Sequence, residues 1–148
     1  MNSEDEFYLE VAHALSSCQL VEQILKLYIS EAFELARKCI GDKMVFSLSG
    51  DDYEDSSLER LIGTFKKLTD NNALVKDLEK FKIERNYLSH KGIANCIDPM
   101  GHLSEPETVE LRERLEHIKS ESHRLRLLLH EEAGKFRPHL WFWDVENG

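Results

Sequence analysis

The chain contains one short segment whose side chains could cut a phosphodiester bond. This hexapeptide, RNYLSH at positions 85–90, places Arg85 and His90 within about one and a half helical turns of each other. Arginine stays cationic and can hold the charge that develops on a phosphate. Histidine titrates near neutrality and can move the proton of a ribose 2′-hydroxyl or of a leaving oxygen. The pair could therefore cleave RNA without a metal ion.

The spacing of these residues also allows a non-catalytic interpretation. On an ideal helix Arg85 and His90 are roughly 140° apart, so they converge on one phosphate only at a fraying helix end or across a two-fold interface. Asn86 lies four residues before His90 and shares its face, where it could orient the imidazole or the RNA backbone. Alternatively, Arg85 pairs with a carboxylate such as Glu84 and His90 caps the helix, whose dipole favours imidazolium by ~0.3–1 kcal/mol.

The charge of the chain is unevenly distributed around this segment. The 148 residues carry a net charge of −9, which argues against a general nucleic-acid-coating protein. Residues 60–92 nevertheless contain eight basic and four acidic residues, so this window has a net charge of +4 and the rest of the chain has a net charge of −13. This basic window predicts a local anion site, with Lys82 and Lys91 as candidate RNA contacts, although a solvated helical face would have the same composition.

The apolar residues recur at spacings of three and four almost throughout the chain. This periodicity predicts an all-α fold, an antiparallel bundle of about four main helices, with no sheet. We expect residues 1–148 to form a single domain with an aromatic tail at about 135–148. The expected helices are about 3–40, 56–69, 73–90 and 104–133.

Capping signals set the expected ends of these helices. Gly41 and Gly92 should end the first and third helices, because glycine readily adopts the left-handed C-terminal conformation. Ser56 and Ser104, each followed three residues later by glutamate, should begin the second and fourth as capping boxes. The first helix is long enough to be kinked or split near Ser16.

The tail contains Trp141, Phe142 and Trp143 in succession. These rings either fold back over the open edge of the bundle or form a docking element for a second copy or an inhibitor. RNA stacking is less favoured, because Asp144 and Glu146 make the surroundings acidic.

Other residue groups give weaker signals for a metal or cofactor. The acidic run at 51–55 lacks the ligand spacing and glycine of a calcium loop. His117, His123 and His130 are too widely spaced for a zinc site without further ligands. The chain has no glycine-rich phosphate loop and no local signature of serine or cysteine catalysis. We therefore expect neither a metal nor a cofactor.

Composition also bears on the location of the protein. No apolar run approaches the roughly 18 residues that would span a membrane. The first six residues are acidic, unlike a secretory or organellar leader. Cys18, Cys39 and Cys96 are widely spaced and odd in number, as is typical of reduced thiols. These features predict a cytoplasmic protein with no membrane partner.

The order Arg85-Asn86, three residues, then His90 resembles the signature of the HEPN superfamily, small all-helical domains that include many RNA-cleaving toxins. The segments LIGTF at 61–65 and NNAL at 71–74 are similar to the helix and loop that precede this motif, and the resemblance covers about residues 58–92. One departure is Gly92, which stands where toxins of the HepT branch carry a tyrosine that is modified by adenylylation. An antidote would therefore have to act differently.

The resemblance implies a homodimer in which two motifs line a shared cleft. Arg85 would stabilise the phosphorane-like transition state, His90 would act as acid or base in attack by the 2′-hydroxyl, and Asn86 would assist. The product would carry a cyclic 2′,3′-phosphate, and an antitoxin or regulatory protein would be a partner. The alternative function is a non-catalytic HEPN-like module for dimerisation or nucleotide binding.

Overall fold

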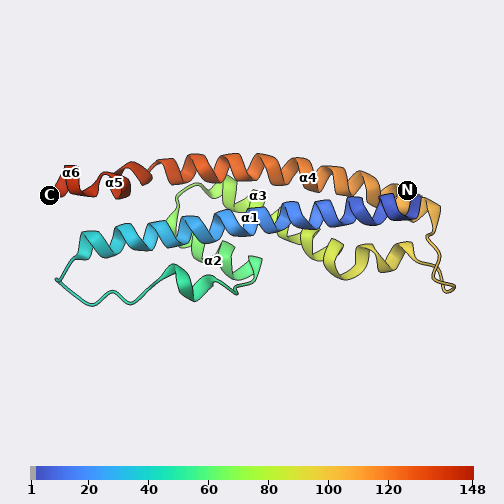
Figure 1. The fold of residues 1–148 in the computed structure, drawn as a ribbon, viewed down its shortest axis with the longest axis horizontal. Coiled ribbons are helices and arrows are strands. Elements are labelled where there is room, and N and C mark those ends of the chain that lie inside the picture. Colours follow the sequence, from blue (N-terminus) through green and yellow to red (C-terminus); the bar gives the residue numbers. More distant parts are fainter. Residues whose placement is uncertain (1–2) are drawn as a thin grey trace.

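The computed structural model describes residues 3–148, which fold into an elongated all-helical structure (Figure 1). Within these residues no strand forms, and Ile97 and Leu103 make one isolated antiparallel bridge. Four of the six α-helices have 11 or more residues, and the last two have five. The helices are α1 (Ser3–Ile40), α2 (Leu58–Leu68), α3 (Asn72–Tyr87), α4 (Glu105–Gly134), α5 (Arg137–Trp141) and α6 (Trp143–Asn147).

Helix α1 is continuous and spans almost the whole length of the molecule (Figure 1). It ends at Gly41, whose φ of 59° is the left-handed conformation expected from the sequence. The expected break near Ser16 and Ser17 does not occur. The Ser17 hydroxyl donates to the carbonyl of His13, and the Ser17 carbonyl accepts a hydrogen bond of 2.6 Å from Ser122 Oγ on α4. Packing against α4 therefore supports the helix at this point.

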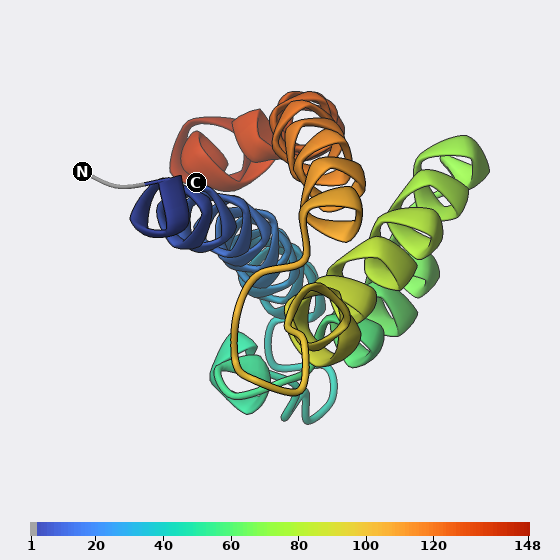
Figure 2. The same ribbon diagram turned by 90° about the vertical axis from the view of Figure 1, so that its right-hand side faces the viewer.

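The prediction of an antiparallel bundle is wrong for the two longest helices. Arg112 contacts Ser3, and Arg137 contacts Glu31, so α4 runs parallel to α1. Helix α3 and the turns that follow it return the chain to the end where α1 began (Figure 1). Helix α3 is antiparallel to α4, because its Glu84 contacts Arg114. In Figure 2, α1 and α3 lie on opposite sides of the bundle.

The ends of α2 and α4 differ in detail from the expected capping boxes. Ser57, not Ser56, caps α2, and its hydroxyl accepts a hydrogen bond from the backbone N–H of Arg60. Ser104 caps α4 as expected, but its hydroxyl donates to the Glu107 carboxylate instead of accepting from the backbone.

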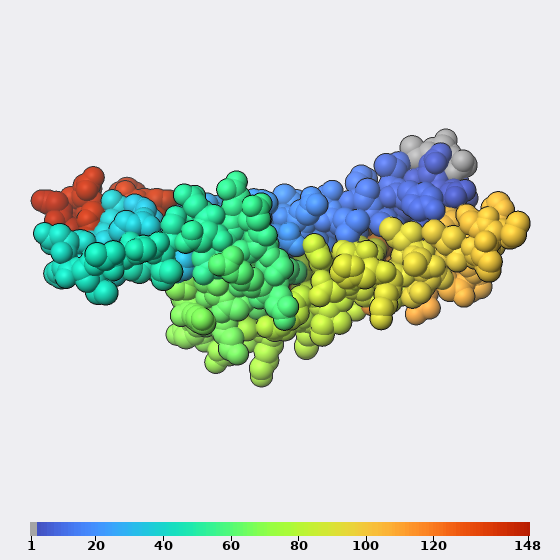
Figure 3. Space-filling view, turned by 90° about the horizontal axis from the view of Figure 1, so that it is seen from below, coloured from blue at the N-terminus to red at the C-terminus, as the bar shows by residue number. Residues whose placement is uncertain are grey.

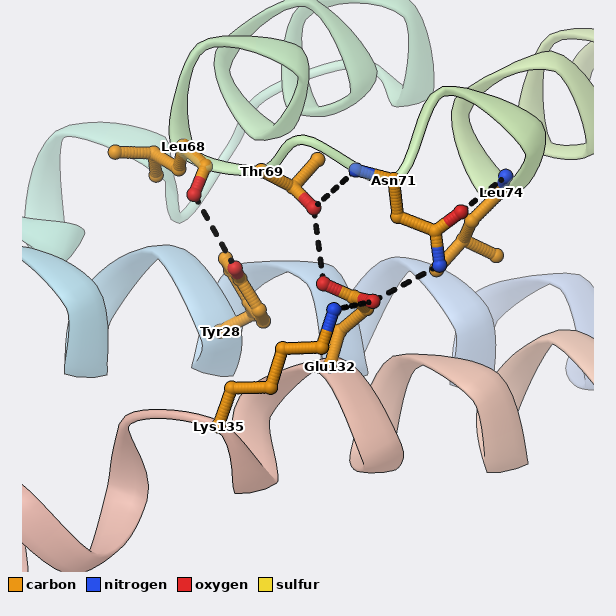
Figure 4. A network of polar contacts seen from close by, with 7 residues as sticks. All are labelled: Tyr28, Leu68, Thr69, Asn71, Leu74, Glu132 and Lys135. Atoms are coloured by element: carbon orange, nitrogen blue, oxygen red, sulfur yellow. Dashed lines mark hydrogen bonds and ion pairs between the residues drawn. The ribbon is translucent and has the colours of Figure 1, made fainter.

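A polar network joins the α2–α3 turn to the end of α4 (Figure 4). The buried carboxylate of Glu132 accepts hydrogen bonds from Thr69 Oγ1 at 2.9 Å, Asn71 Nδ2 at 2.8 Å and Lys135 Nζ at 2.7 Å. Asn71 also caps α3, because its Oδ1 accepts from the N–H of Leu74. The network fixes where α3 begins, and thus which of its residues face α4.

The hydrophobic core runs between α1, α4 and the hairpin of α2 and α3, which bulges from the middle of the molecule (Figure 3). The tail contributes Phe136, whose ring meets Tyr28 edge-on at 5.1 Å. Trp141 and Phe142 do not fold back over the bundle as one interpretation expected, because they are 65% and 57% exposed. No helix of the described chain is both long enough and apolar enough to cross a membrane.

Candidate functional site

The motif lies where α3 changes from an α-helix into a π-helical turn. Helix α3 ends at Tyr87, and the chain continues through the π-turn η2 (Leu88–Gly92) into the short 3₁₀ turn η3 (Ala94–Cys96). His90 is in this π-turn, a rare conformation that is frequent at functional sites. The backbone hydrogen bonds of a π-helix join residues five apart, so the turn that carries His90 is wider than the α-helix that carries Arg85.

The sequence prediction for Gly92 is wrong, because Gly92 does not end the helix in a left-handed conformation. It is buried, and a Cβ placed on it would lie 3.3 Å from Leu111 Cδ1 on α4 and 3.5 Å from Leu88 Cδ1. The absence of a side chain here lets the π-turn pack closely against α4. Close packing, not a chain reversal, therefore explains the glycine.

Arg85 is held against α1 by Glu22. Its Nε lies 3.4 Å from Oε1 of Glu22, and the two side chains are 31% and 14% exposed. Its Nη1 approaches Asn86 Oδ1 at 3.5 Å, the limit of a hydrogen bond. Within residues 3–148 its Nη2 donates no hydrogen bond, so one edge of the guanidinium can still bind an anion. The carboxylate partner expected for Arg85 in the non-catalytic interpretation is therefore present, but it is Glu22 on α1, and Glu84 pairs with Arg114.

His90 is exposed, and its ring makes no hydrogen bond or ion pair within the described chain. Asn86 and Lys91 are also exposed, and within residues 3–148 the one hydrogen bond of the Asn86 side chain is the one it accepts from Arg85. The structure therefore brings Arg85 and Asn86 into contact and leaves His90 and Lys91 open to solvent at the same helix end. These groups can meet a ligand from outside without breaking internal contacts.

Tyr87 anchors the site to α4 through residues that sequence analysis did not single out. The guanidinium carbon of Arg114 lies 3.5 Å from the centre of the Tyr87 ring, close enough for a strong cation–π contact. Two hydrogen bonds from Arg114 to Glu84, of 3.1 and 3.0 Å, fix that guanidinium. Asn95 Nδ2 donates to the Tyr87 hydroxyl at 3.3 Å. No sequence signal marked Arg114, because it lies 27 residues beyond Tyr87.

Lys82, a candidate RNA contact, is engaged within the protein. Its Nζ lies 2.8 Å from Glu79 Oε2 and 3.8 Å from Glu59 Oε1. The hydrogen bond to Glu79 raises the pKa of Lys82. Of the two predicted lysines, Lys91 is therefore the one with a free ammonium group.

Three hollows are lined by residues of both α3 and α4, and none of the three is lined by Arg85 or His90. A hollow of about 660 Å³ is lined in part by Lys80, Glu113 and His117. A second, of about 340 Å³, is lined in part by Asn95 and Glu107. Of the motif residues, Tyr87 lines the second of these hollows, while Arg85 and His90 lie outside them.

Burial favours the protonated form of the two buried cysteine thiols. Burial raises the pKa of Cys18 to about 11, although the charge of Arg85 lowers it. Burial likewise raises the pKa of Cys96. Over residues 3–148 no group of three or more histidine, cysteine or acidic side chains is arranged to hold a metal ion.

Comparison with known proteins gives no relative for this chain. No protein-family model, no curated protein and no solved structure matches it. The function has to be argued from the geometry of the site.

Proposed function

We propose that the protein is a metal-independent endoribonuclease of HEPN type, a toxin or defence effector that cleaves RNA through Arg85 and His90. The observation that carries the proposal is the exposed, unpartnered imidazole of His90 in a π-turn that follows directly from Arg85 and Asn86. A histidine ring that is open to solvent can accept or donate a proton when a substrate reaches it.

The roles of the residues follow from their contacts. Glu22 holds Arg85 by Nε, which leaves the Nη2 edge for a non-bridging phosphate oxygen. His90 takes the proton of the 2′-hydroxyl or returns one to the leaving 5′-oxygen, so the product carries a cyclic 2′,3′-phosphate. Asn86 contacts Arg85 and orients either the Arg85 guanidinium or the backbone of the bound RNA. Lys91 adds a positive charge beside the bound phosphate.

The test compares purified wild type with His90→Ala on total RNA and tRNA in EDTA, followed by end-group analysis. His123→Ala is a matched control, because His123 is also an exposed helical histidine but lies on α4. We expect cyclic 2′,3′-phosphate ends from the wild type and the control and none from His90→Ala. Cleavage that persists in His90→Ala after repurification would refute the proposal.

A second candidate function is a non-catalytic module for dimerisation or nucleotide binding. The contact of Arg85 with the mostly buried Glu22 favours it, since this is how a structural ion pair is built. This function predicts intact RNA with wild type, together with a loss of stability when Arg85 is replaced.

A further inference from the structure

One hollow beside the motif has no part in the proposed cleavage mechanism. It is the hollow of about 340 Å³ lined by residues of α3, η3 and α4, and we call it the Tyr87 hollow after the motif residue that lines it. Tyr87 precedes His90 by three residues, or roughly 5 Å along the helix axis, a distance that one nucleotide can span. A volume of this size is at the lower end of the range for small-molecule sites, so it suits a single planar group.

Tyr87 and Arg114 form a rigid platform at this hollow. The guanidinium carbon of Arg114 lies 3.5 Å from the centre of the Tyr87 ring, and both side chains line the hollow. Two hydrogen bonds to Glu84 hold the guanidinium in place before any ligand arrives. Proteins that bind single-stranded RNA stack bases on aromatic rings and on arginine guanidinium planes. A base that enters the hollow can therefore stack on this pair, and Leu111 adds an apolar wall.

Three polar groups that line the hollow have hydrogen-bonding capacity that the protein does not use. The Tyr87 hydroxyl accepts a hydrogen bond from Asn95, and its own hydrogen has no acceptor among residues 3–148. Within the same part of the chain, Nη1 of Arg114 donates no hydrogen bond. Glu110 is exposed and makes no hydrogen bond or ion pair with any described residue. A matching ligand therefore needs acceptors for two donors and neighbouring donors for one carboxylate.

The charge of the hollow favours a base over a phosphate. Glu107 and Glu110 both line it, and a hydrogen bond from Ser104 lowers the pKa of the Glu107 carboxyl, which therefore stays ionised. The positive charge of Arg114 is matched by Glu84. Two carboxylates repel a phosphate, but they accept hydrogen bonds from the N–H groups of an uncharged base.

We propose that the Tyr87 hollow binds the base of a guanosine that stands directly next to the cleaved bond of the RNA. Guanine presents two neighbouring donors, N1–H and the N2 amino group, which the two oxygens of the Glu110 carboxylate can accept together. Its O6 and N7 are acceptors for the Tyr87 hydroxyl and for Arg114 Nη1. The other three bases place an acceptor beside their donor on the Watson–Crick edge, and a carboxylate repels that acceptor.

The inference rests on the proposed ribonuclease, because it names the substrate of the same site. With its base in the hollow, the nucleotide leaves its phosphate outside, where Arg85 has a free Nη2 and Lys91 has a free ammonium group. A base held on Tyr87 also positions the neighbouring ribose for His90, which follows about one helical turn later. The hollow thus selects the bond, and the motif cleaves it.

The first experiment measures cleavage of short uridine oligonucleotides that contain either one guanosine or one inosine. Inosine lacks only the N2 amino group, so it keeps the stacking surface and the O6 and N7 acceptors. We expect wild type to cut beside the guanosine, with a kcat/KM about tenfold or more lower for the inosine RNA. In Glu110→Ala the two RNAs should be cut at similar rates, because the carboxylate that accepts from the amino group is gone.

Glu113→Ala is the matched control for this experiment. Glu113 is another exposed glutamate of α4, and it lines the hollow of about 660 Å³ and not the Tyr87 hollow. This variant should keep the preference for guanosine. Cleavage by wild type that ignores guanosine, or equal loss of the preference in both variants, would overturn the inference and leave the ribonuclease proposal in place.

The second experiment separates base binding from the chemistry by measuring how the same RNAs bind to His90→Ala. Fluorescence anisotropy of labelled RNA needs no cleavage, so it decides the inference even if wild type cuts no RNA. We expect the guanosine RNA to bind about tenfold or more tightly than the inosine RNA, and Glu110→Ala in this background to remove the difference. Equal binding of the two RNAs to His90→Ala would overturn the inference.

A competition arm of the binding experiment distinguishes RNA from a free nucleotide. Free guanosine monophosphate should displace the labelled RNA only weakly, because it lacks the neighbouring nucleotides that reach Arg85 and Lys91. Competition as strong as that of unlabelled guanosine RNA would assign the hollow to a free nucleotide and overturn its assignment to the RNA substrate.

Discussion

Nε of Arg85 lies 3.4 Å from Oε1 of Glu22, and this oxygen is buried without any hydrogen bond. The contact links the motif to α1, and its two partners are unequally exposed, at 31% and 14%. Removing the cation strands a largely buried carboxylate, whereas removing the anion frees a guanidinium that can reach water.

We expect Arg85→Ala to lower the free energy of unfolding by about 1–2 kcal/mol and Glu22→Gln to lower it by less. Guanidinium chloride denaturation of both variants measures the asymmetry, and Arg85→Lys, which keeps the charge, should fall between them. Equal costs for Arg85→Ala and Glu22→Gln would mean that the unequal burial of the two side chains does not decide the cost of breaking the pair.

The stacking of Arg114 on Tyr87 should hold the π-turn in place. Arg114→Ala removes this contact and both hydrogen bonds to Glu84, at a cost of about 1–2 kcal/mol. Hydrogen exchange of the amides of residues 88–92 should become faster. Arg112→Ala is the control, since Arg112 lies on α4 like Arg114 but pairs with Glu10 on α1 instead of with Glu84. Similar hydrogen-exchange rates for residues 88–92 in both variants would show that Arg114 does not hold the π-turn in place.

Glu132 should make stability depend on pH in the acid range. Burial by itself raises the pKa of this carboxyl, but hydrogen bonds from Lys135, Asn71 and Thr69 outweigh burial and lower it below 4.5. A lowered pKa in the folded state stabilises the protein above the unfolded value, and this stabilisation is lost as the pH falls through the folded value.

Wild type should therefore be more stable than Glu132→Gln at pH 7, and the difference should shrink below about pH 4. Thermal unfolding of the two proteins between pH 3 and 7 measures it. A stability difference between wild type and Glu132→Gln that stays constant or widens as the pH falls would contradict this prediction.

Two glycines with opposite surroundings give a paired prediction. A Cβ on Gly50 would lie 2.4 Å from Ser30 Cβ and 2.7 Å from its Cα, so Gly50→Ala forces the loop away from α1. Gly63 is exposed in α2 with no atom near its Cβ position. Gly63→Ala should therefore stabilise the protein by about 0.5–1 kcal/mol, while Gly50→Ala should destabilise it by about 1–3 kcal/mol. Chemical denaturation of the two variants in parallel checks both signs.

The sequence by itself determined the approximate positions of the four long helices, but not α5 and α6. Apolar residues at spacings of three and four predicted α1 with its observed bounds, and the left-handed Gly41 was correctly placed at its end. These features depend on neighbours within a few positions, which is why periodicity and capping rules capture them. The order Arg85, Asn86, His90 was also readable, because it is a local pattern.

Only the tertiary structure decided how the helices are directed and what the motif residues touch. The parallel packing of α1 on α4 depends on contacts such as Ser17 with Ser122, more than 100 residues apart. The same holds for Glu22 beside Arg85 and for Arg114 over Tyr87. Gly92 looked like a helix stop, but its role is to let the π-turn approach Leu111 on a helix that begins later in the chain. No pattern of neighbouring residues encodes such contacts, since they are set by which faces are buried against each other.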